Sequence, residues 1–227
     1  MGNGIPYDDS VFTSAIDTVT FLDVSYGAGS ATGIFDLTGI EDFTSLTDLL
    51  CHFNQLTSLD VSQNTALTTL KCHHNNLTSL DVSQNTALTG LHCGVNQLTN
   101  LDVSNNTALT WFQCSANNLA TLDVRNGNNT NITAFFCTGN PNLTCINVDD
   151  SSWASNYWTV FNGSIDTQHY FSNNCSFVAV DCTDSLKVTV KGMGNVFVGD
   201  GSVEVIDTFG FSSSPFTISF QLLTVML

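Results

Sequence analysis

The fold is decided by the stretch Leu67-Thr-Thr-Leu70-Lys-Cys72-His-His-Asn75-Asn-Leu77-Thr-Ser-Leu80-Asp-Val82-Ser-Gln-Asn85, which contains two similar half-units of ten or eleven residues. The same frame recurs along the chain, with its first leucine repeated at a constant interval of 21 residues at Leu46, Leu67, Leu88 and Leu109. Ile132 follows two residues late, after the insertion 126–131. A fixed period of this length predicts a solenoid in which each repeat forms one coil.

Each half-unit predicts a turn that leads into a short strand, with Leu70 and Cys72 or Leu80 and Val82 pointing inward. One such coil cannot bury its apolar side alone, but neighbours about 4.8 Å away complete the core and pair the strands. We therefore expect a β-rich solenoid with short parallel strands in two stacks, little helix and capped ends. Asn75 and its equivalents are expected to satisfy backbone groups at the turns, which is a structural role.

The repeat divides the chain into four expected regions. These are an N-terminal cap region (1–45), the repeats (46–148), a C-terminal cap (149–182) and a β-rich C-terminal extension (183–227). Short alternating runs between glycines in the extension predict hairpins packed on the cap or a truncated β-sandwich, whose open strands would allow self-association. Residues 2–10 have neither the basic start nor the apolar run of a signal peptide, so we interpret Met1 as an added expression start or as the start of a gene fragment.

Two runs resemble the short leucine-rich repeats of secreted bacterial surface proteins. They are residues 54–68 (Asn-Gln-Leu-Thr-Ser-Leu-Asp-Val-Ser-Gln-Asn-Thr-Ala-Leu-Thr) and residues 126–133 (Asn-Gly-Asn-Asn-Thr-Asn-Ile-Thr). Residues 140–150, followed by Trp153 and residues 171–175, look like that family's usual C-terminal flank. The likeness covers roughly residues 34–175 and implies a leucine-rich-repeat solenoid, export, and a role in surface adhesion or ligand recognition. The chain departs from that plan after Cys182, where neither a sorting domain nor an appended module is recognised.

The eight cysteines fall into two groups. One repeat position holds the group Cys51, Cys72, Cys93, Cys114 and Cys137. Stacked neighbours about 4.8 Å apart exceed the Cβ separation of a disulfide, so we expect free buried thiols rather than bridges or a metal-binding stack. Cys145 and Cys175 flank the C-terminal cap and are expected to form a disulfide, although Cys182 competes for either partner. Such a bridge would indicate an oxidising, extracellular compartment.

Charge excludes several classes of function. The formal net charge is −16, and the only basic residues are Lys71, Arg125, Lys187 and Lys191. No patch can therefore neutralise several phosphates, which argues against nucleic acid and against anionic lipid. The apolar C-terminal run is too interrupted to span a bilayer, so no membrane insertion is expected.

The outward positions of the two strand stacks differ in kind. The second stack repeats Ser-x-Asp-x-Ser with little change, whereas the first is chemically varied. A repeat that keeps its inward residues while the outward residues of one stack differ from coil to coil is typical of a recognition surface for a protein or glycan. The alternative is that these outward residues have drifted neutrally on a solvated face. The residues that we expect to bind are His52, Lys71, His73, His92, Trp111, Gln113 and Phe136.

Other functions have weaker signals. The repeated carboxylates Asp60, Asp81, Asp102 and Asp123 would repel one another unless they are hydrogen-bonded or bridged by weakly bound calcium, and no other cofactor is expected. His52 and His73, one coil apart, suggest a transition-metal clasp. No hydrolase, protease or phosphate-binding motif is present, so we do not expect an enzyme. A structural or self-assembling surface protein is the main alternative, and the threonine rows at 68, 89 and 110 and at 65, 86 and 107 leave an ice- or mineral-binding protein open.

Overall fold

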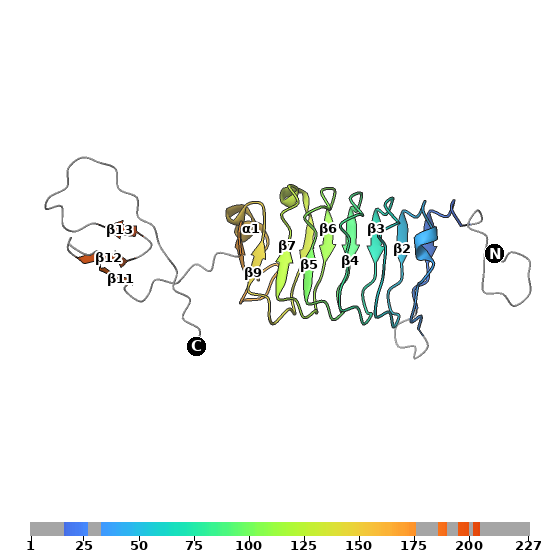
Figure 1. Ribbon diagram of the computed structural model, residues 1–227, viewed down its shortest axis with the longest axis horizontal. Coiled ribbons are helices and arrows are strands. Elements are labelled where there is room, and N and C mark those ends of the chain that lie inside the picture. Colours follow the sequence, from blue (N-terminus) through green and yellow to red (C-terminus); the bar gives the residue numbers. More distant parts are fainter. Residues whose placement is uncertain (1–15, 27–32, 176–185, 190–194, 200–201, 205–227) are drawn as a thin grey trace, which may run out of the picture. The chain divides into compact units, whose positions relative to one another are not determined.

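The computed structural model describes residues 16–26, 33–175, 186–189, 195–199 and 202–204 (Figure 1). The chain divides into two compact units, residues 1–177 and 178–227. The first unit is a solenoid of stacked coils, shown from blue to orange in Figure 1. In the second unit, β11 (Leu186–Thr189), β12 (Asn195–Gly199) and β13 (Ser202–Glu204) form an antiparallel sheet in that order. Among the described residues, none of the helices has the length and apolar character needed to cross a membrane.

The first half-units of the repeats build one parallel sheet, which we call sheet A. Its strands are β1 (Phe21–Asp23), β2 (Asp48–Leu50), β3 (Thr69–Lys71), β4 (Gly90–His92), β6 (Trp111–Gln113) and β8 (Ala134–Phe136), in that order. In each strand from β2 to β8 the middle residue is buried and its neighbours face outward. This alternation confirms the expected solenoid with short parallel strands.

The second half-units build sheet B, which is shorter than the sequence predicts. It contains β5 (Asn100–Asp102), β7 (Thr121–Asp123), β9 (Cys145–Asn147) and β10 (Tyr170–Ser172), in the order β10-β9-β7-β5. The expected strands at 58–62 and 79–83 do not form. On this side the earlier coils are joined by side chains instead, since the Asn85 Nδ2 amide donates to the carbonyls of Val61 and Asn64, at 2.9 Å each.

A continuous apolar core runs through all the coils and is bordered by two rows of buried asparagines. In the row predicted from the turns, the Asn96 Nδ2 amide donates to the carbonyls of Cys93 and Cys72, each at 3.1 Å, and its Oδ1 accepts from the Leu77 amide at 3.0 Å. The same pattern is repeated at Asn75 and Asn117. The structural role that was predicted for these asparagines is confirmed.

The threonine row has a similar role in joining coils. The Thr89 hydroxyl donates to the Thr68 carbonyl at 3.1 Å, and the Thr110 hydroxyl donates to the Thr89 carbonyl at 3.2 Å. Backbone amides of the next coil donate to the same carbonyls. The amides of Thr89 and Gly90, for example, both donate to the Thr68 carbonyl. These hydroxyls therefore bind the neighbouring coil.

The few helical turns described in the solenoid lie in the caps and in the insertion: η2 (Ile40–Asp42) before β2, η3 (Asn129–Asn131) in the insertion, and α1 (Ser151–Tyr157) after β9. Asp150 caps α1 by accepting from the amides of Ser152 and Trp153. Asp150 thereby satisfies two amides that a helix start leaves unpaired.

The cysteines are arranged as the sequence predicts. Cys145 and Cys175 form a disulfide, and the repeat cysteines Cys51, Cys72, Cys93, Cys114 and Cys137 are free and buried. Burial raises the pKa of the Cys51 and Cys93 thiols to about 12. These thiols therefore pack as small apolar groups in a ladder. Cys182 lies outside the described residues.

Candidate functional site

The outward face of sheet A carries all the residues predicted to bind. Strand register aligns Leu50, Lys71, His92, Gln113 and Phe136 in one row across five successive coils. Trp111 begins β6 in the row beside it. His52 and His73 are each the second residue after their strands, β2 and β3. The face is thus continuous from β2 to β8, and its chemistry changes from imidazole to aromatic along the stack.

Imidazole rings cover the middle of this face. The His52 and His73 rings stack with their centroids 4.5 Å apart and their planes 11° apart, and His73 stacks on His92 at 3.7 Å and 12°. The Trp111 ring meets His92 edge to face at 5.2 Å. The sequence predicted that His52 and His73 are neighbours with His74 and His92 nearby, and the structure shows that the His92 ring stacks on His73.

Burial and the crowding of imidazoles disfavour the protonated forms. Desolvation, followed by the neighbouring His92 and His52, lowers the pKa of His73 to about 3. Desolvation and the nearby Lys71 lower the pKa of His92 to about 4. The Nδ1 atoms of His52 and His73 are buried without a hydrogen-bond partner. At neutral pH the stacked rings of His73 and His92 are therefore uncharged.

A strained backbone row borders the face, and sequence reasoning missed it. Phe53, His74, Val95 and Ala116, at one repeat position, have φ angles between 53° and 55°, and Gly139 takes their place in the last coil at 74°. Positive φ costs an L-residue about 1–2 kcal/mol, and β-branched residues such as Val95 rarely adopt it. The Phe53 and His74 rings stack at 4.3 Å, so this row extends the aromatic surface. The available sequence signal is Gly139.

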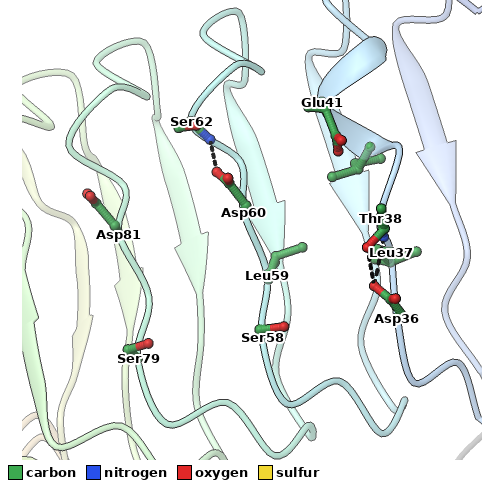
Figure 2. A pocket seen from close by; sticks show the side chains of 11 residues that line it. Asp36, Leu37, Thr38, Glu41, Ser58, Leu59, Asp60, Ser62, Ser79 and Asp81 are labelled. Atoms are coloured by element: carbon green, nitrogen blue, oxygen red, sulfur yellow. Dashed lines mark hydrogen bonds between the residues drawn. The ribbon is translucent and has the colours of Figure 1, made fainter.

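The repeated aspartates lie on the other side of the coils (Figure 2). Each carboxylate accepts from the backbone two residues on, as Asp60 does from the Ser62 amide at 2.9 Å and Asp81 from Ser83 at 2.8 Å. Asp36 in the N-terminal cap repeats the motif with Thr38, and these hydrogen bonds lower the pKa of Asp36 and Asp60. The cap segment that includes Asp36 and the first coils enclose a hollow of about 560 Å³.

Local hydrogen bonds thus stabilise this row of aspartates, which we call the acidic row. Asp102 accepts from the Ser104 amide, and Asp123 is held by the Arg125 guanidinium. In the part of the chain that the structure describes, no group of three or more His, Cys, Asp or Glu side chains could hold a metal ion. Weak calcium bridging by Asp60, Asp81, Asp102 and Asp123 stays a prediction. The clasp suggested for His52 and His73 has no third ligand there.

The fold defines the class of structure: the chain is a leucine-rich-repeat β-solenoid with a buried cysteine row, and it is similar to a bacterial leucine-rich-repeat protein. It is 41% identical over 56 residues to Internalin J of Listeria monocytogenes serotype 4b (strain F2365), a match that covers 25% of this chain. Its structure resembles the functional domain of InlJ from Listeria monocytogenes, which includes a cysteine ladder, at a TM-score of 0.50 and 40% identity over 60% of this chain.

The chain spans only a small part of these relatives' length. The matched part is 6% of Internalin J and 31% of the solved InlJ chain. The leucine-rich repeat domain of APL1B is a more distant structural neighbour, at 22% identity and a TM-score of 0.38 over 58% of this chain. No protein-family profile matches the sequence.

Proposed function

We propose that the solenoid is an extracellular binding module, used in adhesion, whose ligand is a protein that docks on the outward face of sheet A. The observation that carries this proposal is the contrast between the two outward surfaces. Sheet A presents a chemically varied set of residues over a continuous face, whereas the acidic row keeps one motif from Asp36 to Asp102. A protein partner buries about 800 Å² on each side, which requires a broad surface rather than a pocket.

Three features of the face fit a protein ligand. Aromatic and imidazole rings offer apolar area that loses little conformational entropy on binding. The stack from His52 to Trp111 is already fixed by ring contacts in the free chain, so little ordering is needed. Phe136 is 37% exposed at the end of the row and offers an unpaired aromatic anchor.

We also propose that the chain works outside the cell and that it is not an enzyme. The disulfide between Cys145 and Cys175 supports an oxidising compartment. The likeness to Internalin J supports a surface protein of the bacterial type. Hydrogen bonds within the motif occupy the repeated carboxylates, which leaves them poorly placed for acid or base catalysis.

The test is a binding screen of the purified full chain against a panel of cell-surface proteins and a glycan array, with calcium and with chelator. We expect a specific protein hit that Trp111→Ala weakens about 30-fold, as expected for a hot-spot aromatic residue. Tyr170→Ala is the matched control, because Tyr170 is a half-exposed aromatic residue on β10 of sheet B. A glycan-only hit, or equal loss in both variants, would overturn the assignment, and loss in chelator alone would place binding on the acidic row.

A further inference from the structure

Sheet A ends abruptly at β8, and this edge is incomplete. β8 pairs with β6 in parallel register, Phe112 opposite Phe135, and no later strand of the described chain joins it on the other side. The second half of the same coil supplies β9 and the C-terminal cap supplies β10, and both strands belong to sheet B. α1 and the segment 158–164 of the C-terminal cap border this edge of the sheet without adding a strand to it.

Backbone groups of β8 are left open at this edge. In a parallel strand, successive residues direct their amides and carbonyls to alternate sides. The Phe136 carbonyl faces β6, because it accepts from the Cys114 amide at 2.9 Å, whereas the Cys137 amide faces the cap and donates to the Ser164 carbonyl at 2.8 Å. The amide and carbonyl of Phe135 therefore point to the cap side, where the described residues offer neither of them a partner.

The preceding turn shows the same interruption. In earlier coils the corresponding threonine carbonyl accepts two amides from the next coil, as Thr68 does from Thr89 and Gly90. Thr133 occupies this position in the last coil, and no amide of the described chain reaches its carbonyl. The cap resumes the pairing only after β8, at Cys137 and at Gly139, whose amide donates to Asp166.

A groove lies beside these open groups. Its volume is about 660 Å³, and it is lined by β8, the turn before it, α1 and residues of the segment 158–164, with no charged side chain among them. Trp153 and Tyr157 of α1 stack at 4.7 Å along it, and Trp158 stacks on Phe135 at 4.1 Å. Tyr157 is 59% exposed, so its ring is available to a ligand.

We propose that this groove binds an extended, uncharged or basic peptide segment of a partner protein, which adds to β8 as a further parallel strand. The open amide and carbonyl groups are those that a peptide backbone satisfies in strand addition, and the aromatic wall suits apolar side chains. The neutral lining and the net charge of −16 disfavour an acidic peptide.

A sugar fits the groove less well, because two of the polar side chains that line it, Thr133 and Asn162, already make hydrogen bonds within the chain. The Asn162 Oδ1 accepts from the Thr159 amide at 3.0 Å, and its Nδ2 donates to the Tyr157 carbonyl. The Thr133 hydroxyl donates to the Thr110 carbonyl at 3.2 Å. The groove is a second site, independent of the face proposed above, although Phe136 borders both.

The probe is a fluorescein-labelled, capped peptide that copies residues 109–115, the strand with which β8 already pairs, with serine in place of cysteine. Fluorescence anisotropy is measured against the full chain. We expect saturable binding that is weakened at least tenfold when alternate amide nitrogens of the peptide are methylated, because methylation removes backbone donors and keeps the side chains. Equal binding of the methylated peptide, or no saturable binding at millimolar protein, overturns the proposal.

A variant pair locates the site. Tyr157→Ala removes part of the groove wall and is expected to weaken peptide binding at least fivefold. Phe161→Ala is the control, since Phe161 is fully exposed on the same cap and does not line the groove. Equal effects of the two variants would contradict the assigned location, and circular dichroism of each variant checks that the cap remains folded.

Discussion

Replacing one buried asparagine should destabilise the whole solenoid. In Asn96→Ala the Leu77 amide loses its acceptor at 3.0 Å, and the carbonyls of Cys72 and Cys93 lose their shared donor at 3.1 Å. A buried amide left unpaired costs about 1–3 kcal/mol, and each of the two other lost hydrogen bonds contributes about 1 kcal/mol. The free energy of unfolding should therefore fall by about 3–5 kcal/mol.

Asn76→Ala is the matched control for this change. The Asn76 side chain is exposed and accepts only from the Gln97 amide group, at 3.3 Å, so its loss should cost no more than about 0.5 kcal/mol. Urea unfolding followed by circular dichroism compares the two variants. Because a stacked repeat can open locally, hydrogen exchange at Leu77 provides a second readout and should accelerate in Asn96→Ala only. If the free energies of unfolding of the two variants differ by less than about 1 kcal/mol, the buried asparagines do not stabilise the solenoid as we propose.

Three further predictions concern titration and cysteine chemistry. The pKa values of His73 and His92, about 3 and 4, lie below the ordinary 6.5, so the unfolded chain takes up protons first as the pH falls. The free energy of unfolding should therefore decline from pH 6.5 to 4.5. In urea titrations a His73→Gln, His92→Gln double variant should show a shallower decline. The same decline with pH in both proteins would contradict the lowered pKa values of the two histidines. Replacing Cys145 and Cys175 with serine opens a loop with a sequence separation of 30 and should lower stability by about 3–4 kcal/mol, measured by thermal unfolding; no change would exclude a stabilising bridge. The ladder thiols, represented by Cys93, should resist Ellman's reagent until urea unfolds the chain, whereas rapid reaction of the native protein would show that they are accessible.

Most of the fold could be predicted from the 21-residue repeat. Leucine spacing alone predicted the coil, the inward cysteines and the role of Asn75, because these depend on local periodicity that every repeat restates. The first strand of sheet A was not foreseen. Phe21 to Asp23 lie before the regular 21-residue spacing, and their pairing with β2 depends on contacts across an irregular segment.

The sequence predicted which residues of the candidate site face outward, but not how their side chains are arranged. Alternation placed Lys71, Trp111 and Gln113 on an outward face, and the structure brings them onto one sheet. Side-chain rotamers decide that His92 stacks on His73, and residue spacing carries no information on rotamers. The groove beside β8 was also unforeseen, because it results from the point where the cap replaces a coil, and the cap sequence does not repeat.

The most direct test of the central claim is a hydrogen-exchange footprint of the full chain with the protein that it binds most tightly in the panel. We predict protection in the outward strands of sheet A, at 69–73, 90–94 and 111–115, and unchanged exchange in the sheet B segments 100–104 and 121–125. Protection restricted to sheet B or to the acidic row, with sheet A unaffected, would contradict the assignment of the recognition surface.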